Sequence, residues 1–105
     1  LDAGIARSIQ SHRDKETYKI SAHMYFYSGM YDRAEPIYAR LLAAFPEHLT
    51  SMAKLALIRL HHGDTNGARD LAERVIACHP RVRAPTDEEN RAIAEKILEK
   101  LRART

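Results

Sequence analysis

The chain has 105 residues, of which 45% are hydrophobic and 30% charged, and its formal net charge at pH 7 is +3. This size supports one domain, residues 1–105, with a modest core, and the composition argues against wholesale disorder. Basic residues alternate with acidic ones along every segment, which favours a solvated surface over a stripe that binds nucleic acid. No apolar run approaches the roughly 20 residues of a membrane-spanning helix.

The first segment, residues 1–13, sets Leu1, Ile5 and Ile9 at steps of four. Steps of four place side chains on one face of a helix, so the spacing predicts a helix in this segment. We expect this helix to be the remnant of a preceding helix pair.

The chain then carries two predicted helices, residues 14–28 and 31–44, which are joined by a turn at Gly29. Glycine suits this turn because it adopts the left-handed conformation that ends a helix without strain. Pro36 falls near the start of the second helix, where its missing N–H costs little, and Pro46 ends that helix. The apolar members are Ile20, Met24 and Tyr27 of the first helix, and Ala34, Ile37, Tyr38, Leu41 and Leu42 of the second.

A second pair of helices is predicted over residues 49–61 and 66–78, with a turn at Gly63 and a stop at Pro80. A closing helix follows over residues 86–103. It begins with a predicted capping box, in which Thr86 is the N-cap and Glu89 reaches back to it. Ala68, Leu71, Val75 and Ile76 are predicted to face inward, and the closing helix sets Ile93, Ile97 and Leu101 at steps of four.

The two helix pairs repeat at a spacing of 34 residues, because residues 15–48 share six identities in register with residues 49–82. The identities are Ala22 with Ala56, Gly29 with Gly63, Ala34 with Ala68, Arg40 with Arg74, Ala43 with Ala77 and Pro46 with Pro80. A fixed period near this length is typical of helical repeat arrays, in which each pair buries its apolar face against its neighbours. The next residue in this register is Ile97 rather than glycine, so the closing helix is predicted to continue as a cap with a polar back.

This pattern resembles the tetratricopeptide repeat, which carries aromatic and small residues on its first helix and Ala, an aromatic and Pro on its second. The matching residues are Tyr18, Ser21, Ala22, Tyr25, Ala34, Tyr38 and Pro46 in the first repeat, and Met52, Leu55, Ala56, Ala68 and Pro80 in the second. Arg59 and Ala72 replace the aromatics of the second repeat. The resemblance covers residues 15–82. It implies an all-α fold, a right-handed superhelical stack of antiparallel helix pairs with about five to six helices.

In proteins that resemble this one, the first helix of each pair lines a concave face that binds peptides or helices. The resemblance therefore implies a partner-binding groove with an aromatic and aliphatic floor and a few charges. The predicted groove residues are Lys19, His23, Phe26, Tyr27, Ala53, Leu57, Leu60, His61, Asp87 and Arg91. Phe26, Leu57 and Leu60 could equally pack between neighbouring helices. All seven aromatic residues lie between Tyr18 and Phe45, so exposed tyrosines could also form an interaction hot spot.

One subfamily of such repeats clamps the terminal carboxylate of heat-shock chaperones with a set of Lys, Asn and Arg residues. Lys19 stands in register with that clamp, but His23, Lys54, Ala84 and Glu88 replace its other members. The resemblance therefore disfavours this particular ligand, which Glu88 would repel.

Six histidines and Cys78 were weighed as metal ligands or catalytic groups. The neighbours His61 and His62 diverge by about 100° on a helix, and no His-x3-His or Cys-x2-Cys spacing prearranges ligands. Nothing resembles a nucleophile elbow or a phosphate-binding loop. We therefore predict no metal, no cofactor and no catalytic residues.

The preferred prediction is a non-enzymatic interaction module that holds a peptide or helix of a protein partner and does not bind nucleic acid. One alternative is a small chaperone of a bacterial secretion system that shields an aggregation-prone subunit. The excess of Arg over Lys, twelve to five, favours a bacterial source. The other alternative is an oligomerisation element, because two repeats are fewer than the roughly three that such stacks need. The single Cys78, and a beginning without a basic segment followed by an apolar one, predict a cytoplasmic location.

Overall fold

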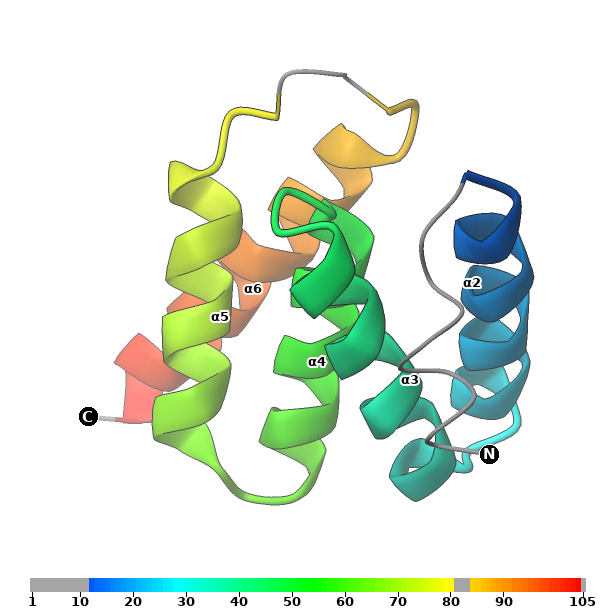
Figure 1. Ribbon diagram of the computed structural model, residues 1–105. Helices are drawn as coiled ribbons and strands as arrows, with labels where there is room; N and C mark the ends of the chain where they lie inside the picture. The colour runs from blue at the N-terminus through cyan, green and yellow to red at the C-terminus, as the bar shows by residue number, and fades with distance from the viewer. Residues whose placement is uncertain (1–11, 81–83, 105) are drawn as a thin grey trace. The chain divides into compact units, whose positions relative to one another are not determined.

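A computed structural model describes residues 12–80 and 84–104, and all regular elements within them are α-helices (Figure 1). The helices are α2 (His12–Tyr27), α3 (Tyr31–Ala44), α4 (Leu49–His61), α5 (Thr65–Ala77) and α6 (Asp87–Arg104). The chain divides after Pro46 into two compact units. The first unit contains α2 and α3, and the second contains α4, α5 and α6. The helix predicted over residues 1–13 falls almost entirely outside the described residues.

The first unit is an antiparallel pair, in which α2 packs on α3. Its core contains Ala22, Ala34, Tyr38 and Leu41, none of which has any exposed surface. The two alanines leave room for close approach of the helices. Ala56 and Ala68 are completely buried in the same way in the second unit.

The interhelical turn of the first unit is a Schellman motif, which satisfies the carbonyl groups at the end of α2. Gly29 has a φ of +79°, and the N–H of Met30 donates to the carbonyl of Tyr25 at 2.8 Å. The second unit repeats this turn 34 residues later. Gly63 has a φ of +82°, and the N–H of Asp64 donates to the carbonyl of Arg59 at 2.8 Å.

Three apolar side chains of α2 are exposed. Ile20 is 59% exposed, Met24 66% and Tyr27 72%. The helix uses its opposite face, around Ala22, to pack on α3. Pro36 also differs from its predicted place, because it is the sixth residue of α3 and lies inside the helix. Its ring therefore removes one intrahelical hydrogen bond.

The second unit is an antiparallel pair, α4 and α5, with α6 packed against both helices. Its core draws on all three helices: Met52, Ala56, Ile58, Ala68, Ala72, Val75, Ala94, Ile97 and Leu101 are buried. The carboxylate of Asp64 caps α5 by accepting the N–H of Gly67 at 2.9 Å. Ile76 was predicted to face inward, but it is 36% exposed.

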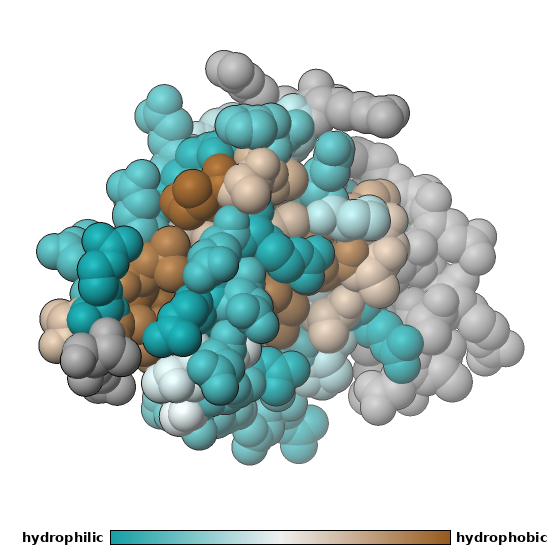
Figure 2. All heavy atoms as spheres, turned by 90° about the vertical axis from the view of Figure 1, so that its left-hand side faces the viewer, coloured by the Kyte–Doolittle hydropathy of each residue, from teal (hydrophilic) through white to brown (hydrophobic). Residues whose placement is uncertain are grey.

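Helix α6 closes this unit with one buried face and one charged face. Asn90, Ala94, Ile97 and Leu101 form the buried face. Its exposed residues include Glu88, Glu89, Glu95, Lys96, Glu99 and Lys100. Figure 2 views the side on which α5 and α6 lie, and hydrophilic atoms cover most of it, with apolar atoms visible between them. At the start of α6, Asp87 accepts the N–H of Ala84 at 2.9 Å, where the sequence predicts a capping box of Thr86 and Glu89.

Candidate functional site

Five rings of the first unit form an aromatic cluster on its two helices: His23, Phe26 and Tyr27 of α2, and Tyr31 and Tyr38 of α3. Phe26 lies at the centre of this cluster. Its ring centroid is 5.2 Å from those of Tyr27 and Tyr31 and 6.3 Å from that of Tyr38. The contacts with Tyr27 and Tyr38 are edge-to-face, an arrangement that aromatic pairs prefer. The rings therefore hold one another in fixed orientations.

A hydrogen bond between His23 and Tyr38 anchors the cluster to the core. The Tyr38 hydroxyl lies 2.5 Å from Nδ1 of His23, and the two ring centroids are 5.6 Å apart. Burial raises the pKa of Tyr38, and the nearby Tyr27 raises that pKa further. The phenol is therefore protonated at neutral pH and can donate to an imidazole that carries its proton on Nε2.

Exposure within the cluster is graded from the core to the surface. Tyr38 is completely buried, His23, Phe26 and Tyr31 are half-buried, and Tyr27 is largely exposed. A partner could thus contact three or four rings without displacing the core. The structure places His23, Phe26 and Tyr27 in one cluster, with Tyr31 and Tyr38 in contact with their rings.

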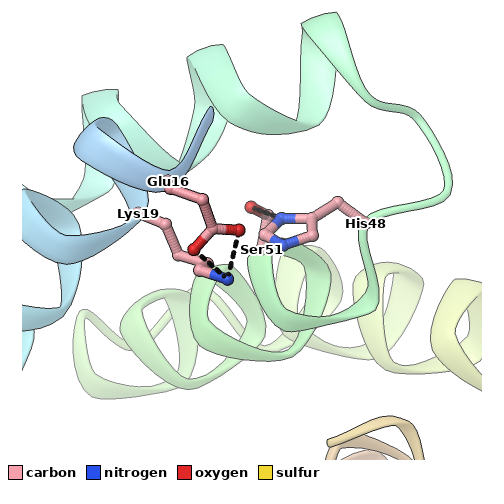
Figure 3. Close-up of polar contacts among 4 residues, drawn as sticks. All are labelled: Glu16, Lys19, His48 and Ser51. Carbon is pink, nitrogen blue, oxygen red and sulfur yellow. Dashed lines mark hydrogen bonds and ion pairs between the residues drawn. The ribbon is translucent and has the colours of Figure 1, made fainter. Parts of the chain in front are cut away.

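Lys19 lies one helical turn before His23 on α2. Its Nζ is 2.9 Å from Oε2 and 3.0 Å from Oε1 of Glu16, as Figure 3 shows. The side chain is still 29% exposed. The ammonium group is therefore paired within its own helix, and an exposed ion pair of this kind contributes little stability.

In the second unit, the predicted residues of α4 differ in exposure. Leu57 and Leu60 are half-buried and His61 is exposed, with its ring centroid 5.7 Å from that of His62. Ala53 is completely buried. The structure corrects the prediction for Ala53, because its face of α4 packs into the core and cannot reach a partner. Figure 3 also shows the start of α4, where Nδ1 of His48 lies 2.6 Å from Oγ of the buried Ser51.

The last two predicted residues, Asp87 and Arg91, bond to the backbone of their own unit. The carboxylate of Asp87 accepts from Ala84. Arg91 donates from Nη2 to the carbonyl of Cys78 at 2.7 Å and from Nη1 to that of Ile76 at 3.3 Å. These carbonyls lie at the end of α5, where a cation is favourable. Both side chains border an open hollow of about 470 Å³. Their charged groups, however, bond to the backbone at the start of α6 and at the end of α5.

Neither the histidines nor the single cysteine of the described residues builds a reactive centre. Those residues contain no group of three His, Cys, Asp or Glu side chains that could hold a metal ion. Burial and the nearby Glu47 raise the pKa of the Cys78 thiol, although Arg91 and Arg74 oppose this shift. A raised pKa disfavours the thiolate, which is the nucleophilic form. None of the described helices combines the length and apolar character that a membrane crossing needs.

Sequence reasoning did not anticipate that Ile20 and Met24 are exposed. Their spacing with Tyr27 places all three within about 60° of the helix circumference, at 100° per residue. Ala22 lies on the opposite side of α2. The sequence therefore has a small residue on one side of α2 and three large apolar residues on the other. This pattern could have indicated that α2 has two apolar faces.

A comparison with protein families identifies the type of repeat. A family model described as tetratricopeptide repeat matches residues 25–84. No curated protein and no solved structure was found to match the chain. The matched segment contains both glycine turns, at Gly29 and Gly63, together with α3, α4 and α5. Because the match spans more than half of the 105 residues, the chain belongs to the tetratricopeptide-repeat family.

Proposed function

We propose that this protein binds a helix or peptide of a partner protein on the aromatic cluster of its first unit. Tetratricopeptide repeats serve as protein–protein interaction modules, so family membership supports a protein partner. The central position of Phe26 supports the choice of surface most strongly. Its half-buried ring is held by Tyr27, Tyr31 and Tyr38, and it needs little reordering when a partner binds.

The chemistry of this surface favours an amphipathic partner segment. Aromatic side chains in fixed positions make effective anchors because they contribute a large contact area at a low cost in conformational entropy. His23 and the Lys19–Glu16 pair add polar groups at the edge of the cluster. A partner with an apolar face and polar flanks fits this combination better than a strongly charged peptide does.

Within the second unit, Leu57, Leu60 and His61 remain proposed as a separate contact surface on α4. The two leucines are one helical turn apart and half-exposed, so both can contribute apolar area. Asp87 and Arg91 are left out of the proposal because their charged groups bond to the backbone.

Site-specific photo-crosslinking in cells tests the proposed surface. The photoreactive amino acid benzoylphenylalanine is placed at Phe26 in the full chain, and at Ala39 and Ala92 as controls, which are exposed positions on α3 and α6. We expect one protein to be captured at position 26 and not at the controls, with at least about a five-fold loss of capture when Lys19→Glu is added.

Equal capture at the control positions, or none at position 26, would exclude the aromatic cluster as the binding surface. If the captured protein precipitates when it is expressed without this chain, the chain acts as a chaperone that keeps that protein from aggregating.

A further inference from the structure

The outer face of α2 carries an exposed apolar surface that extends beyond the aromatic cluster and shares only Tyr27 with it. We call Ile20, Met24 and Tyr27 the α2 stripe. Each of these side chains is more than half exposed, and together they line one side of the helix, opposite Ala22. Met30, which follows the turn, is also 44% exposed.

The contrast with α6 shows that apolar exposure is not a general property of this chain. The outer face of α6 is covered by acidic and basic side chains, as expected of a helix that ends a stack. The α2 stripe, by contrast, consists of three apolar side chains that are all more than half exposed. Contiguous apolar side chains on a surface commonly mark an interaction site.

The surroundings of the stripe favour a second copy of this chain as its partner. Residues 20–31 contain no Asp, Glu, Lys or Arg, and this is the longest such stretch in the sequence. In a two-fold pair, a residue on the axis meets its own copy, so an uncharged side chain is favourable there. The α2 stripe meets this condition at Met24.

The spacing of the stripe suits a two-fold arrangement. Met24 lies four residues after Ile20 and three residues before Tyr27, so the stripe is nearly symmetric about Met24. We propose that two copies associate through antiparallel α2 helices, with a two-fold axis at Met24. Each Met24 then meets its counterpart, and Ile20 of each copy meets Tyr27 of the other.

The side chains suit these positions. Methionine is flexible and adapts its shape, which eases contact with an identical residue across an axis. The Tyr27 ring is held by Phe26 at 5.2 Å and by His23 at 6.3 Å, so it is oriented before the copies meet. Complete coverage of the stripe and Met30 in both copies would bury roughly 1,000 Å², which is the low end for a specific interface.

Interfaces of this size are typical of weak, transient association, so we expect the dimer to form only at high protein concentration. Sedimentation equilibrium of the full chain from about 5 μM to about 1 mM should therefore show a monomer–dimer transition. Met24→Glu and Met24→Lys should each raise the dissociation constant at least about ten-fold, because each places two like charges at the axis.

An equimolar mixture of the two variants provides the decisive measurement. Opposite charges then face each other at the axis, so the mixture should regain the dimer that each variant alone has lost. Ala92→Glu and Ala92→Lys, on the exposed face of α6, serve as controls that leave dimerisation unchanged. Since Met24 is exposed, both variants should retain the helical circular dichroism of the original chain.

Three results would overturn the proposal. The first is a chain that stays monomeric over the whole range, and the second is dimerisation that Met24 variants leave unchanged. The third is a mixture that stays monomeric, which would exclude contact between the two Met24 residues. If the chain is monomeric and its Met24 variants no longer capture the partner protein, the stripe binds that partner and not a second copy of the chain. The Phe26 crosslink is a separate readout, so either proposal can fail alone.

Discussion

The hydroxyl of Tyr38 and Nδ1 of His23 lie 2.5 Å apart and join the two helices of the first unit. Tyr38 is completely buried in α3, whereas His23 is half-buried on α2 beside the proposed partner surface. Tyr38 therefore belongs to the core and supports the aromatic cluster at the same time. A change at this residue should affect both stability and partner binding.

Tyr38→Phe removes the hydroxyl and keeps the ring, so it tests the hydrogen bond alone. We expect a loss of about 1 kcal/mol in the free energy of unfolding, the usual net value of one intramolecular hydrogen bond. Urea denaturation followed by circular dichroism measures this loss. Tyr25→Phe is the matched control, because no hydrogen bond joins the Tyr25 hydroxyl to the residues that the structure describes. Equal losses in both variants would mean that the bond to His23 contributes nothing.

Alkaline pH should destabilise the folded chain through Tyr38. Burial and the nearby Tyr27 raise the pKa of Tyr38, whereas in the unfolded chain it ionises near pH 10. The unfolded state therefore loses this proton first as the pH rises. The contribution of Tyr38 to the free energy of unfolding is therefore fully present below about pH 10. Above that pH it falls by at most about 1.4 kcal/mol per pH unit.

Tyrosinate absorbance during an alkaline titration measures this effect. In the folded chain Tyr38 should stay protonated at about pH 10 to 11, because burial raises its pKa. The tyrosinate absorbance gained up to about pH 11 should therefore be the same in Tyr38→Phe as in the original chain. A smaller gain in the variant would show that Tyr38 itself ionises in this range.

Sequence periodicity predicted the five helices of the described residues. The helices predicted over residues 31–44 and 49–61 have the bounds of α3 and α4, and the other three predictions differ from α2, α5 and α6 by one or two residues at their ends. Gly29 and Gly63 were recognisable because a left-handed turn has a strong residue preference, and both have positive φ values. Local rules of this kind depend only on neighbouring residues.

Residue exposure and side-chain contacts were harder to predict from the sequence. Periodicity shows that a helix has an apolar face, but α2 has two, and only packing decides which one α3 covers. Ala53 was assigned to a groove, and it is buried because its face of α4 meets the core. The bonds of Arg91 to the end of α5 join residues more than ten positions apart, so no local pattern predicts them.

A buried polar contact positions α6 on α4 in the second unit. The side-chain amide of Asn90 donates to Oγ1 of Thr50 at 2.9 Å, and Asn90 is only 3% exposed. Asn90→Ala should cost about 1 to 3 kcal/mol, because the buried amide's packing and its hydrogen bond are both lost.

A double-mutant cycle isolates the bond itself. Thr50→Ala alone should be less costly, and the coupling free energy between the two substitutions should be about 1 kcal/mol. Additive losses would show that Asn90 contributes through packing only. Ala92→Ser, at an exposed position on the same helix, controls for general changes in helix stability.

The two glycine turns should respond alike to substitution because they share one motif. Gly29→Ala and Gly63→Ala should each lower the free energy of unfolding by about 1 to 2 kcal/mol, since alanine is strained at positive φ. Apart from the glycine and its chain neighbours, no atom of the described residues lies within 4 Å of a Cβ added at either position, so a steric clash does not explain this cost. Gly63→Asn should cost less than Gly63→Ala, because asparagine tolerates the left-handed region.

Gly67 provides the contrast within the same unit. Its φ is not positive, but an added Cβ would collide with the side chain of Asp64, the residue that caps α5. Gly67→Asn should therefore be no milder than Gly67→Ala, because the cost arises from the displaced cap and not from the backbone. Urea denaturation of Gly63→Ala, Gly63→Asn, Gly67→Ala and Gly67→Asn compares the cost of alanine with that of asparagine at each glycine. If asparagine and alanine were equally costly at Gly63, strain at positive φ could not be the reason for glycine at that turn.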